Sequence, residues 1–397
     1  MPAMKIERHT RLQRCLWLTL PSTMALMTHC NLASAREGNV FSLSLSETYQ
    51  YDDNLFRLAP DTDNRSAIGA DQRDDFTSAT NVALDASKQV GRHTFYGELS
   101  RSFVKFQQFK QLNYTAADTR VGWSGIFGAE NNWDTYYKRS STQSDFADLQ
   151  TALPNVLTTS TLASNLSVRF AKDWMLRPAF SDDRYKNSSA ARRSDDGHLQ
   201  TESLSFGYHP YTGNVVEAQF RHAERNYDMG GGFQQDELGM LGDWFLSAAS
   251  TIEARVALLQ QKAQDVTGNG DFHQIIGYAN YRWLPSGVSI LNFRVFREIS
   301  TIGLATDQDA VARGSTFQWT WQAWAKTKLD TTLDYRKRDF PQSGFRDITR
   351  SAALVASYSP TPSMSLQATV KKESRSATPE FRSYRDHNYS VALQYAF

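Results

Sequence analysis

Residues 41–51 read Phe41-Ser-Leu-Ser-Leu-Ser-Glu-Thr-Tyr-Gln-Tyr51, with apolar side chains at almost every second position. Successive side chains of a β-strand point to opposite faces, so a period of two indicates a strand with one apolar and one polar face. The predicted apolar face consists of Phe41, Leu43, Leu45, Tyr49 and Tyr51, and the polar face of Ser42, Ser44, Ser46, Thr48 and Gln50. This stretch therefore predicts a two-faced strand.

The same alternation recurs along the rest of the chain, in about eighteen runs. Clear examples lie at 162–170, 252–258, 317–323, 329–335 and 389–397. The connections between the runs alternate in length. Short turns are expected at 89–92, 125–131, 171–173, 209–214, 246–250, 284–287, 325–327 and 359–363. Longer charged or glycine-rich stretches are expected at 52–75, 108–113, 143–157, 186–197, 226–234, 262–271, 300–309, 337–347 and 372–386.

This alternation separates a membrane barrel from a soluble β-sandwich. An outer-membrane barrel has short periplasmic turns and longer extracellular loops, whereas nothing in a sandwich requires them. The sequence also ends with aromatic or aliphatic residues at every second position up to Phe397, which resembles the C-terminal assembly signature of bacterial outer-membrane barrels. The sequence therefore predicts an all-β fold, a transmembrane antiparallel outer-membrane β-barrel of about 18 strands.

The composition excludes several classes of protein. The 397 residues carry 43 Lys and Arg against 42 Asp and Glu, so electrostatics give no reason to expect a nucleic-acid partner. Beyond residue 35 there is no run of about 20 apolar residues, which excludes a bundle of transmembrane helices. An aromatic content of 12% is too high for a disordered chain.

The first 35 residues have the parts of a secretory signal peptide in the right order. A basic leader precedes the apolar stretch Cys15–Met27, and Ala33-Ser34-Ala35 supplies the cleavage pattern. We therefore expect residues 1–35 to be removed and residues 36–397 to form a single barrel domain in a Gram-negative outer membrane. Both cysteines, Cys15 and Cys30, would leave with the leader, so no disulfide is expected.

The sequence contains no catalytic motif with convincing spacing. It lacks the G-x-S-x-G, H-E-x-x-H and phosphate-loop patterns. The glycine runs at 230–232 and 268–270 fall in expected loops, and no helix follows them. We therefore expect no enzyme activity, no cofactor and no metal. One catalytic alternative stays open, an outer-membrane hydrolase that pairs His222 with a serine on a neighbouring strand.

Six arginines fall on the register that would face the lumen, and we interpret them as candidate cargo contacts: Arg169, Arg177, Arg221, Arg255, Arg282 and Arg294. Basic residues along a pore favour anionic cargo. Carboxylates such as Glu217 and Glu253 share this register, so a neutral lumen lined by salt bridges is the competing interpretation. A slip of one residue would exchange the lumen and lipid faces.

Aromatic residues recur beside the expected short turns, among them Trp133, Trp174 and Trp283. Rings at a lipid–water boundary form the girdles of membrane barrels, and we favour that role for them. Stacking on sugar rings is the alternative. Tyr96 and Phe296, on the polar register, are better candidates for a sugar track.

The first expected strand runs into a short motif, whose residues are Tyr51, Asp52, Asp53, Asn54, Leu55, Phe56 and Arg57. This motif resembles the exosortase B-associated extracellular polysaccharide biosynthesis transporter family, the EpsL-type outer-membrane proteins. The stretches 109–116, 335–339 and 351–366 are similar to that family as well. The resemblance implies transport of exopolysaccharide across the outer membrane, together with periplasmic polysaccharide-export components.

Within the motif we favour a structural role over direct glycan binding. Asp52 and Asn54 would bond local backbone amides, and Phe56 would pack on the rim, so that the motif anchors a loop. The resemblance supplies no catalytic residues.

The leading hypothesis is a passive conduit that exports extracellular polysaccharide through a polar lumen, since about eighteen strands can enclose an aqueous channel. Its partners would be the polysaccharide, the periplasmic export components and outer-membrane lipid, with no nucleic acid. One alternative is a general diffusion porin for small oligosaccharides or ions, with the 52–75 loop folded into the lumen. Another is a closed structural or adhesive surface barrel.

Overall fold

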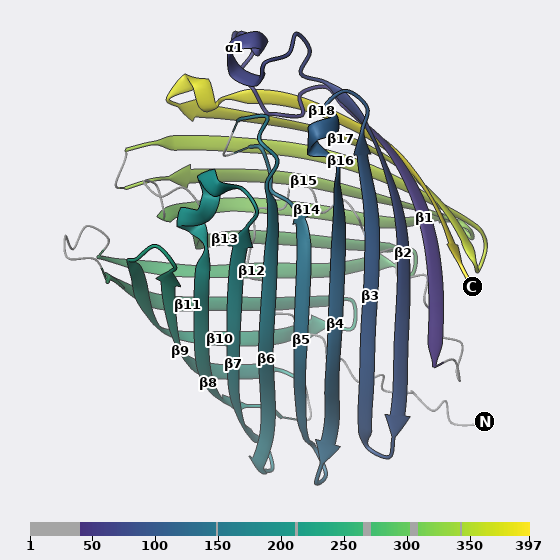
Figure 1. Ribbon diagram of the computed structural model, residues 1–397. Coiled ribbons are helices and arrows are strands. Elements are labelled where there is room, and N and C mark those ends of the chain that lie inside the picture. The colour runs from purple at the N-terminus through teal and green to yellow at the C-terminus, as the bar shows by residue number, and fades with distance from the viewer. Residues whose placement is uncertain (1–39, 148–149, 211–212, 265–270, 302–308, 342–343) are drawn as a thin grey trace.

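The computed structural model describes residues 40–147, 150–210, 213–264, 271–301, 309–341 and 344–397. These residues form eighteen antiparallel strands, each hydrogen-bonded to the strands before and after it. The first strand, β1 (Phe41–Asp52), pairs with both β2 (Asp75–Val90) and β18 (Tyr384–Ala396), so the sheet closes into a barrel (Figure 1). The predicted fold class is confirmed, whereas the expected signal peptide over 1–35 lies outside the described residues.

The other strands follow one another around the barrel in chain order. They are β3 (His93–Phe106), β4 (Tyr114–Phe127), β5 (Asn131–Gln143), β6 (Val156–Ala171), β7 (Trp174–Asn187), β8 (Gly197–Tyr208), β9 (Val215–Tyr227), β10 (Gly232–Ser247), β11 (Ser250–Ala263), β12 (Phe272–Ser286), β13 (Ser289–Thr301), β14 (Asp309–Trp324), β15 (Thr327–Asp339), β16 (Arg346–Thr361) and β17 (Met364–Thr378).

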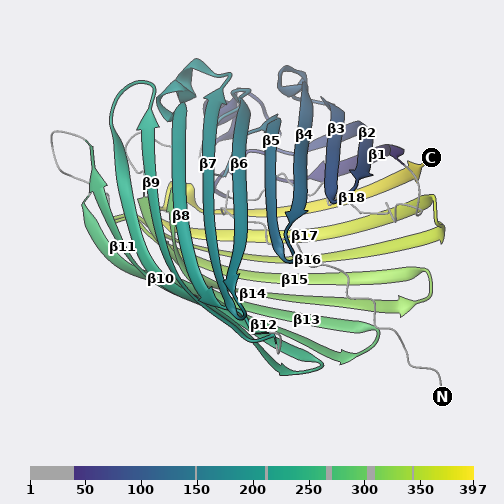
Figure 2. The same ribbon diagram turned by 90° about the horizontal axis from the view of Figure 1, so that it is seen from below.

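The connections alternate in length as predicted, except that the connection at 228–231 is shorter than the one at 209–214 before it. The turns at 91–92, 128–130, 172–173, 248–249, 287–288, 325–326 and 362–363 lie at one end of the barrel, as do residues 209–210 and 213–214 between β8 and β9. The opposite end, the loop end, carries the helix α1 (Asn64–Ile68) and the 3-10 turns η1 (Lys110–Leu112), η2 (Ala190–Asp195) and η3 (Glu380–Arg382). Figures 1 and 2 show the two ends from two directions. Gly91 supplies the positive φ of 62° that its tight hairpin requires.

Several loops are shorter than the sequence predicts, because strands continue through charged residues. The stretch 372–386 is expected as a loop, but β17 extends to Thr378 and β18 begins at Tyr384. There both faces of the strands are polar, so the apolar alternation ends although the backbone pairing continues. The expected loops at 226–234 and 337–347 are shortened in the same way.

The two faces of the sheet differ in polarity as the alternation predicts. On β1, Phe41, Leu45 and Tyr49 are 65%, 45% and 63% exposed on the outer face, and the serines between them turn inward. Large apolar side chains are exposed in the same way on strands all around the barrel. No helix among the described residues is long and apolar enough to span a bilayer.

Aromatic rings border this outer apolar band at both ends. Near the short turns, Trp133 packs edge-on against Trp123, with ring centroids 5.0 Å apart. Near the loops, Tyr51 stacks on Tyr389 across the β1–β18 seam at 6.5 Å. About ten residue steps from Phe41 to Tyr51, on a strand inclined by about 40°, cover roughly 26 Å. That height matches the apolar band of a membrane barrel, and the girdle interpretation fits these rings.

Candidate functional site

The motif at the end of β1 folds back on itself through its own polar side chains. The Asp52 carboxylate accepts a hydrogen bond from the backbone N–H of Asn54 at 2.9 Å. The Asn54 side chain accepts a bond from the N–H of Leu58 at 3.0 Å and donates one to the Leu58 carbonyl at 2.9 Å. These bonds satisfy backbone groups where strand pairing stops. We call residues 52–58 the anchor turn.

Arg57 lies at the centre of the anchor turn and joins it to β18. Its Nη1 lies 3.0 Å from both Asp52 Oδ2 and Asp386 Oδ1, and it donates to the Asn54 carbonyl at 2.7 Å. We call Asp52, Arg57 and Asp386 the seam triad. Their side chains are only 3%, 7% and 0% exposed. Arg57 also adopts a φ of 57°, a left-handed conformation that is uncommon outside glycine.

The charge on Arg57 is secured by the two carboxylates. Burial alone would lower the pKa of the Arg57 guanidinium. Asp52 and Asp386 outweigh that effect and hold the pKa above its ordinary value. A permanently charged arginine is therefore enclosed between two acidic groups.

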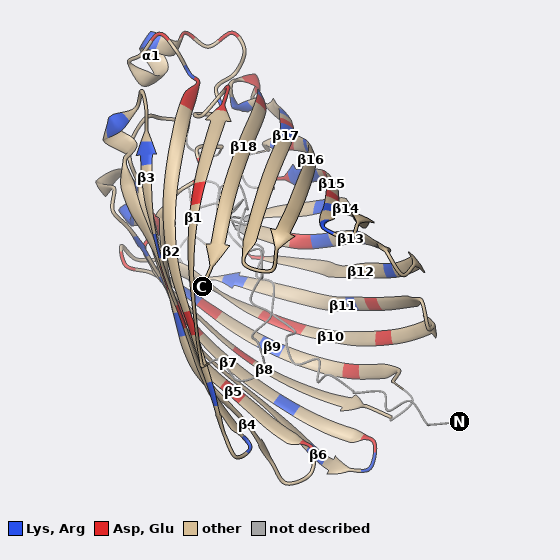
Figure 3. Cartoon of the chain, turned by 90° about the vertical axis from the view of Figure 1, so that its right-hand side faces the viewer, with Lys and Arg blue, Asp and Glu red and all other residues tan. Residues whose placement is uncertain are grey.

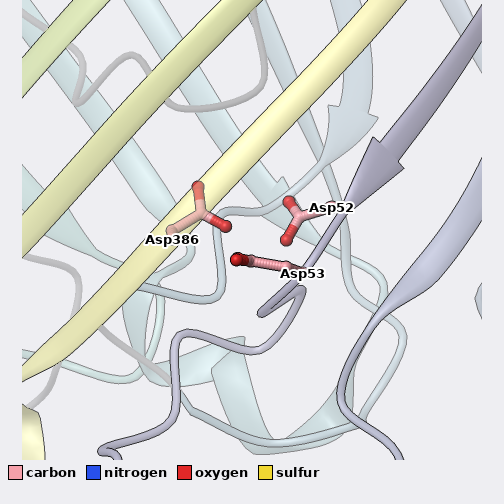
Figure 4. Close-up of side chains that lie close together, drawn as sticks. All are labelled: Asp52, Asp53 and Asp386. Carbon is pink, nitrogen blue, oxygen red and sulfur yellow. The ribbon is translucent and has the colours of Figure 1, made fainter.

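Two further residues of the motif fasten the anchor turn to β18. The Asp53 carboxylate accepts a bond from the backbone N–H of His387 at 2.7 Å and lies 2.7 Å from its ring Nδ1. The Asn54 amide donates to the Arg385 carbonyl at 2.8 Å. Figure 4 shows Asp52 and Asp53, at the end of β1, facing Asp386 on β18. Oxygens of these three carboxylates lie within 4.8 Å of one another, and Arg57 supplies the positive charge between two of them.

An apolar cluster next to the anchor turn holds the longest loop against the inner wall. Phe56 is fully buried and packs edge-on against Phe109 and Phe146, with ring centroids 4.6 and 5.0 Å away. The cluster includes Val104 and Phe106 of β3, which alternate with exposed outward residues and therefore face the interior. The loop at 53–74 thus folds inward at the loop end of the barrel.

Asp52 and Asn54 make the local backbone bonds that the anchor interpretation predicts, and Phe56 packs in the buried cluster. Leu55 joins the apolar cluster, and Tyr51 belongs to the outer girdle. Sequence reasoning missed the partners on β18, because Asp386 is 329 positions from Arg57. Closure of the barrel could have indicated these partners, since the last strand of a closed barrel must pair with the first.

On the inner face, a cluster of opposite composition joins β9, β10 and β11. Glu237 on β10 pairs with both Arg221 on β9, at 2.5 Å, and Arg255 on β11. The neighbouring Phe220 and Val256 are exposed on the outer face, so alternation turns these charged residues inward. We call Arg221, Glu237 and Arg255 the wall triad. Two guanidiniums share one carboxylate, which leaves one positive charge on the wall.

Three other predicted lumen arginines lie on the same side of the barrel. Arg177 on β7 pairs with Glu217, and Arg294 on β13 lies 3.6 Å from Glu298. Arg282 on β12 has no carboxylate within ion-pair distance among the residues that the structure describes. Salt bridges therefore line much of this wall, as the competing interpretation predicts, and the inward carboxylates Asp243 and Glu253 lie on it together with the wall triad and Arg282.

Arg169, by contrast, braces a turn. It lies at the short-turn end of β6, pairs with Glu130 and donates to the Lys172 and His209 carbonyls at 2.8 and 3.1 Å. Its donors are used by these partners. We therefore separate Arg169 from the other five as a structural residue.

Aromatic rings frame two of the inward arginines. The Arg120 guanidinium lies 4.6 Å from the ring centroid of Tyr136 and 5.3 Å from that of Tyr96. Arg294 lies 5.6 Å from the ring centroid of Phe296. Tyr96 and Phe296, the candidates for a sugar track, are thus partly covered by guanidiniums. Arg120 and Tyr136 are not recognisable as a pair from the sequence, because their contact depends on the register between strands.

The hydrolase alternative finds no catalytic pair at the expected place. His222 lies on the outer face with Phe220, and its Nδ1 is 2.7 Å from Asp236. That contact is an ion pair or hydrogen bond between neighbouring strands, β9 and β10.

No protein-family model and no curated protein sequence matches this chain. Among solved structures, the barrel is similar to the outer-membrane protein OpdK from Pseudomonas aeruginosa, with a TM-score of 0.54 and 9% identity over 90% of this chain and 99% of that chain. OccK2 (OpdF) of the same organism is similar with a TM-score of 0.52 and 8% identity, over 91% of this chain and 98% of that chain. OccAB3 of Acinetobacter baumannii has a TM-score of 0.50 and 10% identity, over 90% of this chain and 99% of that chain.

At these identities the similarity concerns the fold. Together with the outer apolar band, the aromatic borders and the alternating connections, it identifies the chain as an outer-membrane β-barrel. The resemblance to polysaccharide-export proteins stays a prediction.

Proposed function

We propose that this barrel is a general diffusion channel for small polar solutes. A closed sheet of eighteen strands is wide enough to leave an aqueous channel. The inward loop at 53–74 supports this function over a wide polymer conduit, because it occupies part of the mouth. The polar inner face gives passing solutes hydrogen-bonding groups in place of bulk water.

Charges of both signs lie side by side on the inner face. Arg255 of the wall triad and Arg282 share the inner wall of β10 to β12 with the inward carboxylates Asp243 and Glu253. On β2, nine strands away around the ring, Asp85 accepts a hydrogen bond from the Ser42 hydroxyl at 3.3 Å. On β15, Asp334 is bonded by the hydroxyls of Thr316 and Ser351. An inner face on which both signs of charge are mixed offers hydrogen-bonding groups to small polar solutes and gives only weak overall ion selectivity.

Small carboxylates are the first organic solutes to test. One of the similar solved structures is OpdK with vanillate, a small aromatic carboxylate, at a TM-score of 0.52 and 9% identity. In this chain the arginines of the wall triad offer planar donors of the kind that recognise carboxylates. A carboxylate would compete with Glu237 for these donors as it passes.

The test is single-channel recording of the refolded barrel in a planar bilayer under a KCl gradient. We expect stable conductance, a reversal potential close to zero, and partial block by small polyethylene glycols but not by large ones. A triple variant, Arg221→Gln, Arg255→Gln and Arg282→Gln, should shift the reversal potential toward cation preference. Folded protein without conductance would overturn the proposal in favour of a closed barrel.

Export of extracellular polysaccharide is the second candidate. The inward rings of Tyr96 and Tyr136 beside Arg120 favour it, because aromatic faces pack on sugar rings, as does the motif resemblance. It requires periplasmic polysaccharide-export components as partners. A long polysaccharide added at the short-turn side would then block the conductance strongly and from that side alone, whereas a general diffusion channel should be indifferent to it.

A further inference from the structure

Three basic residues stand on the outer face of adjacent strands at the loop end: Arg350 on β16, Lys372 on β17 and Arg385 on β18. All three side chains are exposed. They share the register of Leu354 and Val370, which are about half exposed in the outer apolar band. They therefore point away from the lumen, toward the membrane.

The strand register places these cations at the upper edge of the apolar band. Leu354 pairs with Val370, and Val370 pairs with Tyr389, so these residues form one lateral row. Lys372 is one outward position above that row, and Arg350 and Arg385 are two positions above it. Toward the short turns, the stretches 351–361, 364–370 and 388–396 contain no charged residue. Figure 3 shows the corresponding parts of β16, β17 and β18 in tan.

The three cations are close together and lack acidic partners. Ser374 lies opposite both Arg350 and Arg385, which makes each of them a diagonal neighbour of Lys372, with Cα atoms about 7–8 Å apart. None has a carboxylate within ion-pair distance among the described residues. Like charges at this spacing repel one another, and an anion between them removes the repulsion.

Neighbouring basic residues on the outer face already have carboxylate partners. Arg313, Lys337 and Arg346 share Asp339, at 3.2, 3.8 and 3.5 Å, and His387 lies 2.7 Å from Asp53. Arg350, Lys372 and Arg385 are the described basic residues at this end of β16 to β18 that have no such partner on the outer face. Arginine and lysine at the membrane surface attract anionic lipid headgroups, and the guanidinium matches a phosphate geometrically.

We propose that Arg350, Lys372 and Arg385 bind the phosphate groups of an outer-leaflet glycolipid whose acyl chains lie along Leu354 and Val370. One lipid satisfies both surfaces, since its apolar part meets the band and its phosphates meet the cations above it. Across the barrel, the outward positions of β8 and β10 carry Glu202 and Asp236, which repel phosphate. The site does not depend on the channel function.

The test compares two triple variants with equal loss of charge. The first is Arg350→Gln, Lys372→Gln and Arg385→Gln. The control, Arg184→Gln, Lys186→Gln and Lys262→Gln, removes three exposed outward cations from β7 and β11. Binding of bis-phosphorylated lipid A to the full barrel in neutral detergent micelles is measured by native mass spectrometry. We expect a roughly ten- to hundredfold loss of affinity in the first variant and little change in the control.

Dephosphorylated lipid A should bind the wild type as weakly as bis-phosphorylated lipid A binds the first variant. Wild-type binding should also weaken as salt rises, a measurement that needs no variant to fold. Equal losses in both variants, or equal binding of the two lipids, would overturn the proposal. Competition by millimolar inorganic phosphate would also overturn it, because the site would then be one for free phosphate.

Discussion

In the seam triad two aspartates share one arginine, whereas in the wall triad two arginines share one glutamate. Both join side chains on different parts of the sheet through charge-assisted hydrogen bonds of the same chemistry. The seam arginine is 7% exposed, and the wall arginines are each 15% exposed on the inner face. An arginine–carboxylate pair can therefore stabilise the fold where it is buried, or contact passing solutes where water reaches it.

The two triads also differ in what their charged groups can reach. The acidic groups of the seam are enclosed, so they act on their neighbours only. The guanidiniums of the wall face the lumen, where a passing anion can reach them. Each of the following variants tests this division between a structural and a solute-contacting use of arginine.

The largest effect is expected from Arg57→Met. It leaves Asp52 and Asp386 buried without a counter-charge, which should lower the free energy of unfolding by about 3–5 kcal/mol. Urea unfolding in micelles, followed by tryptophan fluorescence, measures the change. Arg65→Met, which removes an exposed pair with Asp71 in the same loop, is the control and should leave the transition where it was. A loss below about 1 kcal/mol would contradict a structural seam.

Phe56→Ala separates the apolar part of the anchor from its ionic part. Removing a fully buried ring should cost about 3 kcal/mol, because the space beside Phe109 and Phe146 is left unfilled. Limited proteolysis should cut within 53–74 much faster than in the wild type. The reversal potential of the channel should change little, and a large change would show that the cluster also controls the solute path.

Glu237→Gln reverses the comparison by removing the shared carboxylate from the wall triad. The loss of two charge-assisted hydrogen bonds should cost about 1–2 kcal/mol, less than at the seam, because water reaches the wall. The reversal potential should move toward anion preference, since two guanidiniums are then uncompensated. If it stays fixed, the wall triad is not on the conduction path.

The smallest effect is expected from Arg282→Gln. This residue has no described acidic partner to lose, so stability should change by less than about 0.5 kcal/mol. Anion permeability should fall slightly, in the direction opposite to Glu237→Gln. Bilayer recordings of both single variants and the double variant measure whether the two shifts add, as expected for separate sites.

The sequence predicts the strand number, the alternation of connections and the two faces, because all three follow from local spacing. Phe41, Leu43 and Leu45 lie outward as their period of two requires. The sequence overestimates the length of the loop at 372–386. Lys372 and Arg385 lie on strands that continue past the apolar band, where the alternation of hydrophobicity ends.

The contacts at the site depend on which strands are neighbours and in which register. Asp52 and Phe56 are recognisable as an anchor because their partners are partly local. The contacts of Asp386 and of the wall triad cannot be recognised from the sequence, since each requires the pairing of separate strands to be known to within one residue. Closure of the sheet is the one global rule that would have placed Asp386 beside Asp52.

The position of the seam triad also sets an order of events in assembly. Arg57 and Asp386 are 329 positions apart, so bringing them together freely would cost roughly 5 kcal/mol in chain entropy. Hairpins between consecutive strands form over far shorter loops, and they should therefore precede the β1–β18 pairing. Arg57 then joins the ends of β1 and β18 after all other strand pairs have formed. Its loss should speed reopening more than it slows the earlier steps of barrel formation.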